Sequence, residues 1–276
     1  MTTSTDAPDH TADRRIRLSL GGVVRAEAVK LLSLRSTWWS LGATVVVMAL
    51  FALAQAASLQ ILADNPELGG TVMTGAEVVS GGYQFGMLVV AVLGVLAITG
   101  EYSSGMIRST LTAVPTRIPM LAAKAVVLAV LTVLVGAVSL AASAAVTLPL
   151  LSRHGLVPAL DAAETWQVCG GMVYFLVSVA LLSLGVGTIL RNSSAAITSV
   201  LGLLLLLPMV LPYIRLEWVQ QLTAYLPVSA ATAFLALNDR LVLAVELTAW
   251  QGVIVVALYP VLTLAVGAVL LLRRDA

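Results

Sequence analysis

Charged residues are scarce in this sequence of 276 residues: aspartate, glutamate, lysine and arginine together make up 11% of it, whereas hydrophobic residues make up 59%. A soluble globular domain carries charge on about a quarter of its residues. A soluble fold of this length could not remove so much apolar surface from water, so lipid must be the solvent for most of the chain. The net charge of +1 implies no strongly acidic or basic partner, and we expect no nucleic-acid partner.

Cysteine and histidine are almost absent as well. The single cysteine, Cys169, excludes a disulfide within the chain and a metal cluster built on thiolates. The two histidines, His10 and His154, have no second ligand nearby in the sequence, so we expect no metal site. The motifs G-x-x-x-x-G-K-[ST], H-E-x-x-H and G-x-S-x-G are also missing. We therefore expect neither a bound cofactor nor an enzyme active site on this chain.

Six long apolar segments contain no aspartate, glutamate, lysine or arginine. Each is long enough to cross the hydrocarbon core as a helix, which takes about 17–25 residues. We therefore predict an all-α polytopic membrane protein with six transmembrane helices. In the second of them, Gly82-x-x-x-Gly86 would permit close approach of another helix. The predicted spans are 37–62, 79–100, 125–151, 165–190, 195–214 and 247–272.

The positions of the basic residues predict how the spans are oriented. If the spans alternate from a cytosolic N-terminus, twelve of the 15 lysines and arginines fall on the cytosolic side and three fall outside. Cytosolic loops carry an excess of these residues, so both termini are predicted to be cytosolic. The cytosolic set is Arg14, Arg15, Arg17, Arg25, Lys30, Arg35, Arg108, Arg117, Lys124, Arg191, Arg273 and Arg274, and the outer set is Arg153, Arg215 and Arg240.

The segment before the first span has two parts. Residues 1–19 are polar and are predicted to form a disordered cytosolic tail without a signal peptide, whereas residues 20–276 form one membrane domain. Residues 20–35 can place apolar side chains on one helical face and Arg25 and Lys30 near lipid phosphates. This pattern favours a helix lying in the cytosolic interface. A helical extension of the first span is the alternative.

The connection 101–124, between spans two and three, is the longest on the cytosolic side. Gly105 permits a change of backbone direction. Ile107 and Leu111 follow at helical spacing, and Pro115 disfavours helix at the residue before it. We therefore predict a bend followed by a short cytosolic helix. This helix either receives a partner protein or is a surface helix without a partner.

The outer connection between spans five and six is mostly apolar, yet neither of its halves is long enough to cross a membrane. Pro227 divides it into 216–226 and 228–237, which we predict to be two short re-entrant helices in the outer leaflet. Before them, Pro208 and Pro212 are predicted to interrupt the end of the fifth span.

Two motifs surround the cytosolic ends of the first three spans. One is Gly100-Glu101-Tyr102-x-x-Gly105-Met106-Ile107-Arg108, followed by Pro115-x-Arg117 and Lys124; the other is Arg25-x-Glu27-x-x-Lys30-Leu31, followed by Arg35-Ser36-x-Trp38. The first resembles the cytosolic loop of ABC-2 type permeases, the membrane subunits of one class of bacterial ABC exporters. The second resembles the N-terminal interfacial helix of the same family. The resemblance covers roughly residues 20–272.

The resemblance implies that the loop after span two is a coupling helix, which seats in a cleft of a separate cytosolic ABC ATPase subunit. Glu101 would lie at the hinge and pair with Arg108 or with a base on the partner; alternatively, it stabilises the loop helix through the helix dipole. Met106 stands where the family often has threonine, so no hydroxyl is available there. The implied coupling residues are Glu101, Tyr102, Gly105, Met106, Ile107, Arg108, Leu111, Pro115 and Arg117, and those of the interfacial helix are Arg25, Glu27, Lys30 and Arg35.

The resemblance also implies that ATP and Mg²⁺ bind to the partner subunit, and that two permease copies or paralogues enclose a pathway in the bacterial plasma membrane. The charge-free spans favour an amphipathic or hydrophobic substrate and an energy source outside the chain, because ion-driven transporters usually keep a charged side chain within the membrane. Export is the direction that the resemblance implies. A membrane immunity or scaffold protein that binds partners without transport is the alternative function.

Overall fold

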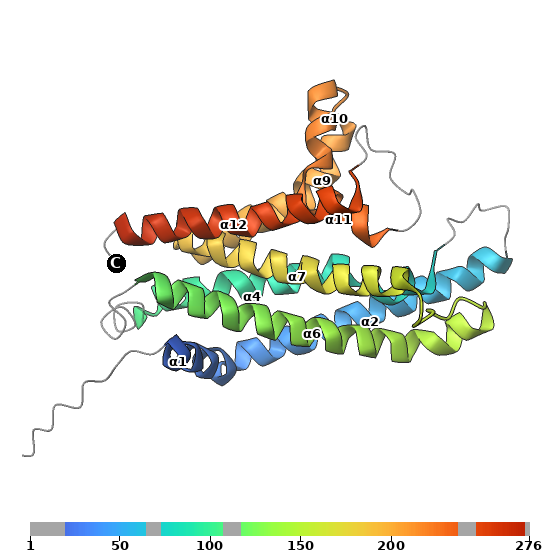
Figure 1. The fold of residues 1–276 in the computed structure, drawn as a ribbon, viewed down its shortest axis with the longest axis horizontal. Coiled ribbons are helices and arrows are strands. Elements are labelled where there is room, and N and C mark those ends of the chain that lie inside the picture. Colours follow the sequence, from blue (N-terminus) through green and yellow to red (C-terminus); the bar gives the residue numbers. More distant parts are fainter. Residues whose placement is uncertain (1–19, 65–72, 107–116, 237–246, 274–276) are drawn as a thin grey trace, which may run out of the picture.

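The computed structural model of the chain describes residues 20–64, 73–106, 117–236 and 247–273, and these ranges contain helices and no strand (Figure 1). Six helical segments are long and apolar enough to cross a membrane. The predicted number of spans is therefore confirmed, and the chain has the helices of a multi-pass membrane protein. The six segments are Arg35–Leu59, Gly75–Ser103, Arg117–Arg153, Ala163–Leu190, Ser193–Tyr213 and Ala249–Arg273.

The segment before the first span is a helix of its own. Helix α1 (Leu20–Ser33) and helix α2 (Arg35–Asp64) are separated by Leu34 alone. The indole N–H of Trp38 donates to the Leu32 carbonyl oxygen at 2.9 Å, so the chain is held across the break. The α1 helix packs against α6 rather than continuing the first span.

The second span consists of a short helix, α3 (Gly75–Ser80), and a long one, α4 (Tyr83–Ser103). A Cβ atom at Gly82 would lie 2.3 Å from the carbonyl oxygen of Met48 on α2, and one at Gly86 would lie 2.7 Å from the Met48 Sδ. Real Cβ atoms do not come so near other atoms, so Gly82, which meets backbone, requires glycine, whereas a side chain at Gly86 would require the Met48 side chain to move. The close helix approach predicted from the GxxxG motif is confirmed.

Helices α4 and α7 (Ala163–Leu190) form the centre of the bundle (Figure 1). A Cβ atom at Gly94 of α4 would lie 2.5 Å from the Ala180 carbonyl oxygen of α7, so the two backbones nearly touch. Helices α2 and α6 (Arg117–Arg153) pack together beside this pair, and α12 (Ala249–Arg273) packs on α7. In Figure 1, α12 and the α2–α6 pair lie on opposite sides of α4 and α7.

The fifth span is irregular, as its prolines predict. It consists of α8 (Ser193–Leu201), a π-helical turn (Gly202–Leu206), α9 (Leu207–Val210) and a 3₁₀ turn (Leu211–Tyr213). Pro208 has no N–H, and its ring conflicts with the carbonyl group four residues earlier in a regular α-helix. The wider π turn directly before it relieves this conflict. The predicted interruption by both prolines is confirmed.

Two short helices follow, as predicted, with Pro227 in the first turn of the second. These are α10 (Glu217–Ala224) and α11 (Pro227–Leu235), and residue 237 of the predicted second helix lies outside the described residues. The α11 helix packs on α7 and α12, where a Cβ atom at Gly252 would lie 2.5 Å from the Ala230 carbonyl oxygen. The α10 helix projects away from the bundle (Figure 1).

We expect the substitution Gly94→Ala to destabilise the protein, because the added methyl group would collide with the α7 backbone. Overpacking typically costs about 1–3 kcal/mol, and the better helix propensity of alanine returns up to about 1 kcal/mol. The midpoint of thermal unfolding in detergent measures the effect. Gly42→Ala on α2 is the matched control, because a Cβ atom there meets nothing within 4 Å. Equal midpoints for the two variants would contradict the close crossing of α4 and α7.

Candidate functional site: a buried ion cluster at one end of the bundle

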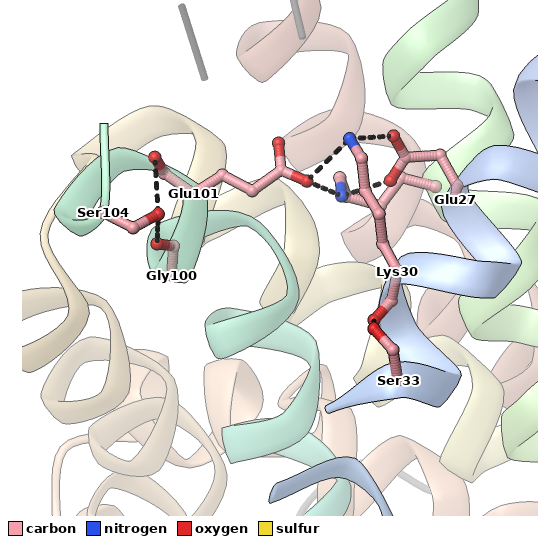
Figure 2. A network of polar contacts seen from close by, with 7 residues as sticks. Glu27, Lys30, Ser33, Gly100, Glu101 and Ser104 are labelled. Carbon is pink, nitrogen blue, oxygen red and sulfur yellow. Dashed lines mark hydrogen bonds and ion pairs between the residues drawn. The ribbon is translucent and has the colours of Figure 1, made fainter. Parts of the chain in front are cut away.

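Four charged side chains from three helices meet at one end of the bundle. Helix α1 contributes Glu27 and Lys30, α4 contributes Glu101, and α6 contributes Lys124; we call these four residues the ion cluster. Figure 2 shows Glu101 reaching from the end of α4 towards Lys30 and Glu27 on α1. The cluster thus joins the helix before the first span to the two helices that flank the connection between spans two and three.

Lys124 lies at the centre of the cluster. Its Nζ donates to Glu27 Oε2 at 2.5 Å and to Glu101 Oε1 at 2.8 Å. Lys30 Nζ donates to the other oxygen of Glu27 at 2.9 Å and to Glu101 Oε1 at 3.4 Å. Two ammonium groups therefore face two carboxylates, and the formal charges of the cluster cancel.

The local sequence explains why Glu27 and Lys30 of α1 both face the bundle. Val23, Glu27 and Leu31 recur every four residues and form the buried stripe of α1. Lys30 follows Glu27 by three residues and therefore lies beside it on the helix surface. Glu27 is 2% exposed, whereas the side chain of Lys30, at 34%, keeps part of its surface outside.

The burial of Lys124 makes the cluster interdependent. Lys124 is 1% exposed, and removing such a group from water costs several kcal/mol unless opposite charges and hydrogen bonds replace its hydration. Glu27 and Glu101 provide that replacement. Removing one member would leave a charge buried without compensation, which is more costly than the loss of the contact itself.

The two members of the ion cluster on α1, Glu27 and Lys30, are both stabilised in their charged forms. Burial by itself raises the pKa of Glu27, but the ammonium groups of Lys124 and Lys30 outweigh it and hold this pKa below its ordinary value of 4.5. Burial likewise lowers the pKa of Lys30, but the carboxylates of Glu27 and Glu101 raise it above its ordinary value of 10.5. Folding therefore favours the ionised cluster.

The end of α4 contains an unpaired acceptor and a sharp bend. Oxygen Oε2 of Glu101 is buried and accepts no hydrogen bond from the part of the chain that the structure describes. Ser104 Oγ donates to the Gly100 carbonyl at 2.8 Å and closes the helix (Figure 2). Gly105 follows with a φ of +72°, a backbone conformation that glycine adopts readily. The predicted change of direction at Gly105 is confirmed.

Tyr102 and Arg117 make contacts outside the ion cluster. The guanidinium carbon of Arg191, in the turn after α7, lies 5.2 Å from the centre of the Tyr102 ring, which is cation–π geometry. Arg117 Nη1 donates to the Leu271 carbonyl oxygen in the last turn of α12 at 2.6 Å. These contacts connect α4, α6, α7 and α12 at the same end of the bundle.

The predicted site residues fall into three groups. Glu27, Lys30 and Glu101 come together in the ion cluster. The exposed group is Arg25, Arg35, Gly105 and Met106, and Tyr102 and Arg117 are partly exposed. The third group lies outside the described residues, together with the predicted short helix and the predicted Glu101–Arg108 pair; its members are Ile107, Arg108, Leu111 and Pro115.

Lys124 was not predicted from the sequence as a site residue, and the predicted third span begins just after it. Helix α6 in fact begins at Arg117, so Lys124 is inside the helix and buried. The described partners of Glu101 are Lys124 and Lys30, and Glu27 is buried beside them rather than exposed on α1. One signal was available: the chain has only two lysines, and one of them, Lys124, directly precedes a long apolar segment.

We expect Lys124→Met to destabilise the protein by about 3–5 kcal/mol, because it leaves two buried carboxylates facing a single ammonium group. Thermal unfolding in detergent is the measurement. Arg153→Met, at the exposed far end of α6, is the matched control and should have little effect. Adding Glu27→Gln and Glu101→Gln to Lys124→Met should recover most of the loss. A midpoint for Lys124→Met no lower than that of the control would contradict the cluster.

The lowered pKa of Glu27 predicts sensitivity to acid. Its contribution to stability is fully present above its ordinary value of 4.5 and is lost as the pH falls through the lower pKa of the folded state. The contribution of Lys30 is fully present below 10.5 and is lost as the pH rises through its raised pKa. We expect an unfolding midpoint that is level between these limits and falls on the acid side. A Glu27→Gln variant should show a shallower acid fall, and an unchanged profile would refute the assignment.

Neither a scan against models of protein families nor a search of curated proteins gives a match for this chain. The resemblance to ABC-2 type permeases therefore stays a prediction from the motifs.

Proposed function

We propose that the chain is the permease subunit of a bacterial ABC exporter, which moves an amphipathic or hydrophobic substrate across the plasma membrane. The observation that carries the proposal is the ion cluster. It bonds α1 to α4 and α6, the two helices on either side of the connection 104–116. A force applied to that connection would therefore act on three helices at once.

The proposed force comes from a separate cytosolic ATPase subunit, which binds ATP and Mg²⁺ and contacts the connection. Glu101 and Lys124 lie on the helices that enter and leave it. Their bond, buried and charge-assisted, resists separation far better than an exposed ion pair. The ends of α4 and α6 would then move as a rigid unit when the partner changes conformation.

The cluster end of the bundle is the cytosolic one in this proposal, since the basic residues collect there. Helix α1 would lie in the inner interface, with the exposed Arg25 and Arg35 near lipid phosphates and the exposed Trp39 at headgroup depth. In the same proposal α10 and α11 would form the re-entrant outer cap: α11 is covered by α7 and α12 of its own chain, and α10 would be covered by a second subunit, because backbone at that depth must be covered by protein.

A second permease copy or a paralogue is the proposed membrane partner. Large apolar side chains of the irregular fifth span and α10 are exposed, and they include Met209, Tyr213 and Trp218. Helix α10 also projects from the bundle, so it has few neighbours within its own chain (Figure 1). In this proposal a second subunit covers this surface, and the transport pathway lies between the two chains.

The proposal is tested by replacing residues 107–114 with a Gly/Ser linker and measuring which ABC ATPase of the source cell co-purifies with the unchanged chain and with the variant. We expect binding of the ATPase to be lost, because the linker cannot present a helix to the partner's cleft. Replacing 154–161, in the connection at the opposite end, with the same linker is the matched control and should leave binding intact. Undiminished binding by the first variant would contradict the coupling role.

Efflux distinguishes a permease from a non-transporting immunity or scaffold protein. A permease must lose efflux of its hydrophobic or amphipathic substrate when the partner is made unable to hydrolyse ATP, and a panel of hydrophobic antibiotics is the probe. The triple variant Glu27→Gln/Lys124→Met/Glu101→Gln should bind the ATPase and still lose most of the efflux, because its helices are no longer tied together. Efflux unaffected by an inactive ATPase would favour the non-transporting alternative.

A further inference from the structure

A lateral groove of about 390 Å³ opens at the end of the bundle opposite the ion cluster. One wall is the first part of α7, with Trp166, Gly170 and Tyr174, and the other is the first part of α12, with Trp250. Phe234 of α11 also lines it. The proposed coupling to an ATPase assigns no role to this groove.

The interior of the groove offers a ligand little to bond with except apolar surface. The hydroxyl of Tyr174 donates to the Val253 carbonyl oxygen at 2.8 Å, and the indole N–H of Trp166 donates to the Leu160 carbonyl oxygen at 2.8 Å. Both polar groups are therefore already satisfied. The Tyr174 and Phe234 rings pack edge to face at 5.9 Å and give the groove a rigid aromatic surface.

The wall of α7 contains open space at one position. A Cβ atom at Gly170 would meet nothing within 4 Å, whereas one at Gly171 would lie 2.8 Å from the Phe234 ring. The absence of a side chain at Gly170 thus creates room, while Gly171 permits α11 to pack closely. The nine residues that line the groove include no charged side chain, and Gln167 is the one amide among them.

Two exposed tryptophans show what surrounds the groove. Trp166 is 62% exposed and Trp250 is 77% exposed, and each lies in the first turns of a membrane-spanning helix. Indole rings prefer the depth of the lipid headgroups, so the groove runs from that depth into the hydrocarbon. Water is not available there to fill an apolar groove between two spans, but lipid chains are.

We propose that the groove binds one acyl chain of a bilayer phospholipid, with the polar part of the lipid near Gln167 and Trp250. The neutral, aromatic lining suits a hydrocarbon chain, and the volume is in the range of small-ligand sites, which is about 300–1,000 Å³. The bound chain would fill the space between α7 and α12 beside α11. This proposal depends on the membrane location of the spans and not on coupling to an ATPase.

The test is native mass spectrometry of the purified full chain, delipidated in detergent and titrated with dioleoyl phosphatidylethanolamine. We expect the first lipid to bind about tenfold more weakly to Gly170→Phe, whose ring fills the groove, which corresponds to about 1.4 kcal/mol. Gly42→Phe on α2 is the matched control, because that position is also open and lies outside the groove. Its affinity for the lipid should equal that of the unchanged protein.

A second variant keeps the test decisive if Gly170→Phe fails to fold. Val253→Trp fills the groove from α12 and should weaken the same binding event. Equal affinity in the filled variants and the control would overturn the proposal. It would also be overturned if filling the groove dissociated an oligomer without changing lipid binding, because the occupant would then be a second copy of the chain. Neither result would bear on ATPase binding, which is measured separately.

Discussion

The ammonium group of Lys124 lies between the carboxylates of Glu27 and Glu101, where almost none of its surface reaches solvent. A charge in such a place is stable only if opposite charges and hydrogen bonds replace its hydration. Helices α1, α4 and α6 must therefore keep their relative positions, because separating any of them would leave a buried charge unpaired. The contact between α4 and α7 instead depends on close packing, because at Gly94 the α4 backbone touches the backbone of α7.

The two ends of the bundle consequently differ in chemistry. At the cluster end, charged groups and the Arg117 and Arg191 contacts join five helices or their ends through polar interactions. At the other end, the neighbours of α7 are aromatic rings and close glycine contacts with α11. Hydrogen bonds and ion pairs are directional and fix the relative positions of the helices they join. An apolar groove makes no directional contacts with the molecule that it binds. This contrast is what the two proposals use: a partner ATPase would act at the cluster end, and a lipid chain would occupy the groove at the other end.

Several local features could be predicted from the residues that cause them. Pro208 interrupts the fifth span because it lacks an N–H, and Gly105 takes a positive φ at the predicted bend. Gly82 lies at the predicted close helix approach. In each case the cause is the covalent structure of one residue, so the prediction required no knowledge of which helices are neighbours. The partners of Glu101 could not be predicted in this way, and the predicted pairing with Arg108 lies outside the described residues.

The sequence by itself determined that the chain has six segments long and apolar enough to cross a membrane, because the cost of placing charge in hydrocarbon acts on each segment separately. Only the tertiary structure decided that Lys124 is buried and that Glu27 and Glu101 are its partners. These residues are 97 and 23 positions from Lys124, and the bonds between them exist only once α1 is packed on α6 beside the end of α4. Charges so far apart in the sequence show no periodic pattern that would reveal their pairing. The energy of their interaction depends on burial, and burial exists only in the folded protein.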